Sequence, residues 1–471
     1  MKRRTVMQNL SYSLFSNVVT TILSVLIILV LPKIISIEEY GYWQLYLFYT
    51  SYVGIFHLGW VDGIYLRYGG KELENINQST LKKQIILFFS LETFLVVIMT
   101  FFVLFFYNVD TIEIALFSIS NILFLNFKSL IMYTLQSVNK IKEYAVMVTS
   151  DRLLFLLVFI LLVTTNNLSI RYLILTDIFA KILSSIIGMY YLKPIFEGKI
   201  HFGIEDIFEV RENINAGFKL LMSYLCSIFI VGVARLNIVS VWGIETFAKI
   251  SLTLSISNFL MILINAIGVV VYPMIRKLDE EVLPSIYVGV RDILMAILLI
   301  LLLSYYPLNI ILSYWIPEYS ESIMYMAILF PICLYEGKMY LLVNTYLKCL
   351  RKEKILMKIN IFSLILSVIL SYLSTQIIGS LNLAVVSILL VLGFRCVVSE
   401  IYVLKFLNIK SFLDIFIELL LTIIFILTSW YLNPITGMGV YLFVMVIYLI
   451  LKKTKLIKSF SLVRELMRKR I

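Results

Sequence analysis

Long apolar runs separated by short charged or turn-forming breaks occupy most of the chain. A helix needs about 20 apolar residues to cross the roughly 30 Å hydrocarbon core of a bilayer. Cutting the sequence at its charge clusters and at Pro, Gly and Asn breaks gives fourteen such runs. They are residues 10–32, 42–66, 82–107, 111–136, 143–164, 168–193, 214–241, 245–275, 286–314, 321–347, 354–378, 380–406, 411–431 and 435–451. The runs are continuous rather than alternating, which excludes a closed β-barrel. The pattern predicts an all-α integral membrane protein with about 14 transmembrane helices.

Composition supports the same class. Of 471 residues, 61% are hydrophobic and 15% are charged. In soluble globular proteins about 45–50% of residues are apolar and about 25% are charged. The four cysteines all lie in or beside apolar runs without a CxxC pair. They are interpreted as small core residues, and no disulfide or metal framework is expected.

Basic residues indicate how the helices are oriented, because Lys and Arg accumulate in cytoplasmic loops. With the N-terminus placed inside, 28 of the 40 Lys and Arg residues fall in cytoplasmic segments and 2 in external loops. An even number of spans with both termini cytoplasmic is therefore predicted. The same bias explains most of the +11 net charge, so nucleic acid is not an expected partner. The basic tail, residues 452–471, is expected to be cytoplasmic and to contact anionic membrane lipids.

The most polar segment before the tail, about residues 194–213, follows the sixth predicted helix. Such a linker is expected between two six-helix halves of a transporter built from repeats. We therefore predict an N-terminal lobe over 1–200, a C-terminal lobe over 201–406, and an appended helix pair over 407–451. A sequence echo favours a pseudo-twofold repeat: Ile37-Glu38-Glu39-Tyr40-Gly41 and Ile244-Glu245-Thr246-Phe247-Ala248 lie between equivalent helices of the two halves.

Ionisable side chains inside the spans are candidate functional residues, because each costs about 2.5–3.5 kcal/mol at the bilayer centre on insertion scales. Thirteen were identified: Asp62, Glu92, Lys128, Asp151, Arg152, Asp177, Lys181, Arg235, Glu336, Lys338, Arg395, Glu400 and Glu418. Arg235 stands out because no acid lies within a helical turn of it, and Asp62 because it lies in the Gly-flanked stretch 59–63. A guanidinium donates two parallel hydrogen bonds and so suits a phosphate. Arg395 is the next candidate for this role.

Mutual neutralisation is the alternative interpretation of these charges, because seven acids and six bases nearly balance. Asp177 and Lys181 are spaced i,i+4 on one helix face and are expected to pair. Lys128 and Arg152 are expected to pair with Asp151 or with Glu92 under the same interpretation.

Signatures of catalysis are missing from the sequence. There are two histidines, no GxxxxGK[ST] motif and no long soluble insertion. A His-based metal site, a built-in ATPase and a cofactor are therefore not expected. The predicted external loops are short and almost uncharged, which disfavours a membrane enzyme such as a glycan polymerase.

Several stretches in order resemble the Wzx-type polysaccharide flippases of the multidrug/oligosaccharidyl-lipid/polysaccharide (MOP) exporter superfamily. They are the basic start followed by Asn9-Leu10-Ser11-Tyr12, the first helix ending in Leu31-Pro32, the turn 37–43, the end of helix 2 over 58–68, and the end of helix 8 over 272–278. The two-lobe plan covers residues 1–406. Many Wzx-type proteins have twelve spans, whereas fourteen is closer to lipid II flippases and some capsule exporters.

The resemblance implies two lobes around a central cavity lined by helices 1, 2, 7 and 8. The implied substrate is an undecaprenyl-diphosphate-linked oligosaccharide, moved across the bacterial cytoplasmic membrane for O-antigen, capsule or exopolysaccharide synthesis. A polysaccharide polymerase and other assembly proteins are the implied partners. The cavity candidates are Arg235, Asp62, Arg395, Lys128, Arg152, Lys338 and Arg67. Another MOP-type transporter, either a lipid II flippase or a drug or cation antiporter, is the alternative.

Overall fold

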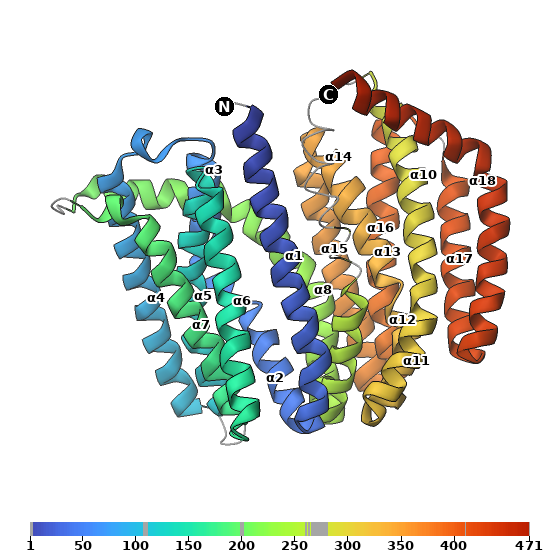
Figure 1. Ribbon diagram of the computed structural model, residues 1–471, viewed down its shortest axis with the longest axis horizontal. Coiled ribbons are helices and arrows are strands. Elements are labelled where there is room, and N and C mark those ends of the chain that lie inside the picture. The colour runs from blue at the N-terminus through green and yellow to red at the C-terminus, as the bar shows by residue number, and fades with distance from the viewer. Residues whose placement is uncertain are drawn as a thin grey trace. The chain divides into compact units, whose positions relative to one another are not determined.

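The computed structural model describes residues 3–106, 112–197, 202–259, 261, 264, 281–409 and 411–470. Within these ranges every regular element is a helix and no strand occurs (Figure 1). Twelve of the described helices are long and apolar enough to cross a membrane. The predicted all-α membrane architecture is therefore confirmed.

The chain divides into two compact units, Met1–Leu225 and Cys226–Ile471. The boundary lies inside one long helix, and the predicted division at residues 200/201 stays a prediction. Unit 1 contains α1 (Arg3–Ile34), α2 (Ile37–Thr50), η1 (Val53–His57), α3 (Trp60–Tyr68), η2 (Leu73–Asn75), α4 (Gln78–Phe106), α5 (Ile112–Ser137), α6 (Ile141–Thr164), α7 (Ile170–Tyr191), η4 (Lys193–Phe196) and the first part of α8 (Ile204–Ser257). Helix α5 packs against α2, α3, α4 and α7, so it lies at the centre of this unit.

Unit 2 begins within α8 and ends at the C-terminus. Its further elements are α10 (Leu283–Leu301), η5 (Leu302–Ser304), α11 (Tyr305–Trp315), η6 (Pro317–Tyr319), α12 (Ser320–Leu329), α13 (Ile332–Lys338), η7 (Met339–Val343), α14 (Asn344–Cys349), α15 (Glu353–Tyr372), η8 (Leu373–Ile377), α16 (Leu381–Phe406), α17 (Phe412–Tyr431) and α18 (Pro434–Arg470). Helix α18 packs against both α10 and α17. Its final part, dark red in Figure 1, turns away from the direction of its first part. The predicted tail is thus largely a continuation of α18.

Two features explain why fourteen predicted spans give twelve long helices. The second predicted span, 42–66, is divided into α2, η1 and α3, and Leu58 and Gly59 both have positive φ angles, 52° and 84°. Helix α8 contains the seventh predicted span and the start of the eighth, joined at Gly243, where the backbone leaves helical geometry. The motif predicted at 272–278 lies outside the described residues.

The two segments of the sequence echo both begin a helical stretch directly after a break. Ser36 caps α2: its hydroxyl accepts from the Glu39 N–H while the Glu39 carboxylate accepts from the Ser36 N–H. This reciprocal arrangement satisfies two N-terminal donors and fixes the start of the helix. The second segment, 244–248, follows the non-helical Gly243 in α8. The repeat itself stays a prediction.

Glycines allow α3 to approach α8 very closely within unit 1. A Cβ atom added to Gly63 would lie 1.8 Å from the backbone oxygen of Asn213, and one added to Gly217 would lie 1.9 Å from that of Gly59. Backbone atoms are therefore in direct contact along this seam. Replacing Gly63 or Gly217 by any residue with a Cβ atom would push the two helices apart.

We expect Gly63→Ala to lower the free energy of unfolding by about 3 kcal/mol, the upper end of the overpacking range, because the clash is with backbone rather than a flexible side chain. Thermal melting of the purified protein in detergent measures the effect. Gly439→Ala in α18 is the matched control, since a Cβ there meets no atom within 4 Å. Equal melting temperatures for the two variants would contradict the close approach of α3 and α8.

Candidate functional site

Four fully buried charges form the centre of a network in unit 2. The Nε of Arg291 on α10 lies 2.5 Å from Glu400 on α16, and its Nη2 lies 2.7 Å from Glu418 on α17. The Nζ of Lys338 on α13 lies 2.6 Å from Glu418 and also pairs with Glu400. These four residues are at most 5% exposed. Each carboxylate therefore contacts both cations, and each cation contacts both carboxylates.

Three further charges extend this arrangement. The Nζ of Lys452 on α18 lies 2.6 Å from Asp414 and 3.4 Å from Asp292. Arg291 joins the two parts, because its Nη1 is 3.8 Å from Asp414 and 3.9 Å from Asp292. We call these seven residues the charged network; it contains three cations and four carboxylates. Because its members come from α10, α13, α16, α17 and α18, it attaches the C-terminal helix pair to the rest of unit 2.

Sequence reasoning found only part of the charged network. Lys338 was predicted to line a cavity, and the structure places it between Glu400 and Glu418. Arg291, Asp292 and Asp414 were absent from the intramembrane candidates, and Lys452 was assigned to the cytoplasmic tail. The available signal was the adjacent Arg291-Asp292 pair directly before the apolar run 293–303.

Arg395 on α16 is held by a second set of contacts in unit 2. It forms an ion pair with Glu336 on α13 and donates to the Ser227 hydroxyl of α8 at 2.6 Å. The residue is 2% exposed. Its role as a phosphate ligand remains a prediction, and in this structure a carboxylate already accepts from it.

Arg235, the first phosphate candidate, lies on α8 and is partly exposed. Its Nη2 donates to the Ser251 hydroxyl at 2.8 Å, and its guanidinium carbon lies 4.9 Å from the centre of the Phe247 ring. A cation over an aromatic face is attracted by the negative face of the ring. The described contacts thus orient the guanidinium through a hydroxyl and a ring.

The predicted ion pairs of the first half are confirmed in unit 1. The Nζ of Lys128 lies 2.8 Å from Asp151, and Arg152 approaches the same carboxylate at 3.8 Å. Lys181 pairs with Asp177 one turn earlier on α7. Tyr46 donates to Asp177 at 2.6 Å. Mutual neutralisation therefore accounts for these charges in the structure.

Asp62 and Arg67 both lie on α3 but differ in their surroundings. Arg67 bonds to the first turns of α8: its guanidinium lies 2.9 Å from Glu209 and 2.6 Å from Glu212, and donates to Asn213 at 2.7 Å. Among the residues described, no Lys, Arg or His lies within ion-pair distance of Asp62. Arg67 thus fixes α8 to α3, whereas the Asp62 carboxylate is partly exposed and not neutralised by a described base.

The seven predicted cavity residues are divided between the units. Asp62, Arg67, Lys128 and Arg152 belong to unit 1, whereas Arg235, Lys338 and Arg395 belong to unit 2. Lys128 and Arg152 share a partner, Asp151. In the described ranges no three His, Cys, Asp or Glu residues are grouped as metal ligands.

No family model and no curated protein matches the sequence. Solved structures match it in fold over most of its length. An inward-facing multidrug resistance MATE family transporter of the MOP superfamily aligns with a TM-score of 0.65 and 13% identity, covering 84% of this chain and 94% of that chain. A MOP superfamily transporter from Pyrococcus furiosus aligns with a TM-score of 0.59 and 12% identity, covering 86% and 95%.

A flippase is also among these structures. The lipid II flippase MurJ, in its inward closed conformation, aligns with a TM-score of 0.59 and 14% identity, covering 95% of this chain and 99% of that chain. At such identities the likeness shows the fold alone. The chain therefore has the fold of MOP superfamily transporters, and the neighbours with this fold are membrane transporters and a flippase rather than enzymes.

Proposed function

We propose that this protein is a flippase that moves undecaprenyl-diphosphate-linked oligosaccharides across the bacterial cytoplasmic membrane, supplying surface polysaccharide synthesis. Its termini lie in the cytoplasm in this proposal. A polysaccharide polymerase and other assembly proteins receive the product. No covalent bond of the cargo changes.

The main support for this proposal is that the C-terminal helices α17 and α18 are an integral part of unit 2. The charged network attaches them through Asp414, Glu418 and Lys452. The flippase neighbour covers 95% of this chain, whereas the MATE neighbour covers 84%. A transporter fold that includes the additional helices α17 and α18 favours function as a flippase over function as a drug exporter.

The physical problem explains the proposed mechanism. A diphosphate-sugar headgroup cannot enter hydrocarbon without losing its hydration, and unpaired charge is costly there. The protein offers it polar and cationic groups while the lipid tail remains in the bilayer. Arg235 suits the diphosphate because its guanidinium fork matches phosphate oxygens. Alternating access then exchanges inward-open and outward-open states, as in repeat-built transporters.

Deletion of the gene tests the proposal in the cell. We expect loss of one surface polysaccharide and accumulation of its lipid-linked oligosaccharide, with both restored by the wild-type gene. Unchanged surface glycan and unchanged lipid-linked intermediates would contradict it.

A drug or cation antiporter is the second candidate, favoured by the TM-score of 0.65 to the MATE transporter. It predicts that deletion increases sensitivity to cationic drugs and leaves lipid-linked glycans unchanged. Measuring both properties in the same deletion strain separates the two functions.

A further inference from the structure

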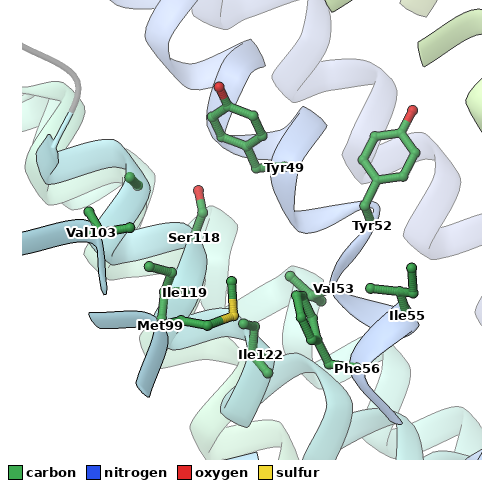
Figure 2. A pocket seen from close by; sticks show the side chains of 11 residues that line it. Tyr49, Tyr52, Val53, Ile55, Phe56, Met99, Val103, Ser118, Ile119 and Ile122 are labelled. Atoms are coloured by element: carbon green, nitrogen blue, oxygen red, sulfur yellow. The ribbon is translucent and has the colours of Figure 1, made fainter. Parts of the chain in front are cut away.

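An apolar cavity of about 300 Å³ lies within unit 1, where α2 and η1 meet α4 and α5 (Figure 2). Its lining residues are Tyr49, Tyr52, Val53, Ile55, Phe56, Met99, Val103, Ala115, Ser118, Ile119 and Ile122. None of them is charged. The cavity contains none of the residues predicted to bind a headgroup.

The wall of the cavity favours hydrocarbon over water. The Ser118 hydroxyl donates to the backbone oxygen of Ile114, one turn earlier on α5. A buried water needs two to four polar partners, and an apolar cavity of roughly 150 Å³ already stays dry and accepts hydrophobic ligands. A cavity of about 300 Å³ with this lining therefore suits an apolar ligand.

Helix α4 forms one wall and is bordered by the membrane. In an apolar 18-residue stretch of this helix, 17% of the residues are buried in the protein, the smallest share among the described candidate spans. Phe101, Phe102 and Phe105, near the same end of α4 as Met99 and Val103, are 57–68% exposed. In a bilayer these rings lie in hydrocarbon. Lipid chains are thus present beside the cavity at high local concentration.

The cavity also lies at the break in the second span. Five of its lining residues come from Tyr49 to Phe56, the end of α2 and the 3₁₀ helix η1. Such short helices have poorer hydrogen-bond geometry than α-helices. Leu58, directly after η1, has a left-handed backbone conformation that costs about 1 kcal/mol or more for a non-glycine residue. An occupant packed against Val53 and Phe56 adds contacts to this strained segment.

We propose that this cavity binds one acyl chain of a bilayer phospholipid, which stabilises the broken α2–η1–α3 segment. The polar headgroup stays outside the cavity at the membrane surface. The site is independent of the cargo, because none of its lining residues is a predicted headgroup ligand. The proposed lipid site is therefore expected whichever substrate the protein carries.

Photolabelling of the full-length protein tests this site. The protein is placed in nanodiscs of phosphatidylethanolamine and phosphatidylglycerol that include a phosphatidylethanolamine with a diazirine in one acyl chain. After irradiation, labelled peptides are mapped by mass spectrometry. We expect labelling within residues 49–56 and 115–122. Val103→Phe fills the cavity from α4 and is expected to abolish this labelling.

The matched control is Val97→Phe, the same substitution on the same helix at a site that is 61% exposed. It should leave the labelling of 49–56 and 115–122 unchanged. Thermal melting of both variants reports whether they fold. Labelling that persists in folded Val103→Phe would overturn the site. Selective displacement of the probe by added undecaprenyl phosphate would contradict the assignment of a phospholipid chain as the occupant. It would indicate that the cavity binds an isoprenoid tail instead.

If Val103→Phe does not fold, Ala115→Leu fills the same cavity from α5 with a smaller increase in volume. The same loss of labelling is expected, and its absence would count against the proposal equally.

Discussion

Lys338→Met is expected to destabilise the protein by about 3–5 kcal/mol, the cost of leaving buried charge without its partner. The substitution removes the ammonium that contacts both Glu400 and Glu418. Methionine has a similar length and is apolar, so packing is largely kept while two carboxylates share the single remaining cation, Arg291. Thermal melting of the purified protein in detergent measures the loss.

Two variants isolate the electrostatic cause. Lys249→Met removes a lysine whose carboxylate partner Glu321 lies 3.7 Å away and is 87% exposed, so a change below about 1 kcal/mol is expected. The double variant Lys338→Met/Glu418→Gln removes one negative charge together with the positive one and should recover much of the stability. If Lys338→Met melts like Lys249→Met, the charged network does not stabilise unit 2 as described.

Arg235→Ala is expected to reduce glycan export by about tenfold to a hundredfold, because a charged hydrogen bond contributes roughly 1.5–3 kcal/mol and each 1.4 kcal/mol is a factor of ten. The guanidinium is the group proposed to hold the diphosphate. Surface polysaccharide and accumulated lipid-linked oligosaccharide, compared at equal protein levels in the membrane, measure the effect.

Controls distinguish phosphate binding from loss of fold. Arg235→Lys retains the positive charge but not the two parallel N–H donors of the guanidinium group. This variant should therefore retain part of the glycan export activity. Arg171→Ala removes an arginine that pairs with Glu113 at an exposed position, 63% exposed for the Arg171 side chain, and should leave export unchanged. Normal export by Arg235→Ala would remove Arg235 from the mechanism.

Much of the fold could be predicted from sequence because hydrocarbon length sets the length of each apolar run. The limits of α5, α6 and α16 lie within two residues of their predicted spans. The break in the second span could not be predicted in this way, because residues 51–59 remain mostly apolar. Next to the break, Gly59 and Gly63 lie against the backbone of α8, whose residues are far away in the sequence.

The candidate site was predictable only where partners are near in sequence or belong to the same half. Asp177 with Lys181 followed from i,i+4 spacing, and Lys128 with Asp151 from their proximity in the same half. Arg291 pairs with Glu400, 109 residues later, and Lys452 reaches back to Asp292, 160 residues earlier. Such pairs depend on which helices are neighbours, and a single sequence does not give that.

Transport by the purified protein tests the central claim most directly. Proteoliposomes carrying fluorescent undecaprenyl-diphosphate-linked oligosaccharide are treated with a membrane-impermeant quencher, and the fraction of label that becomes accessible is followed over time. The proposed function predicts that wild-type protein exposes inner-leaflet label much faster than protein-free liposomes and Arg235→Ala proteoliposomes. Identical rates for wild-type protein and protein-free liposomes would contradict it.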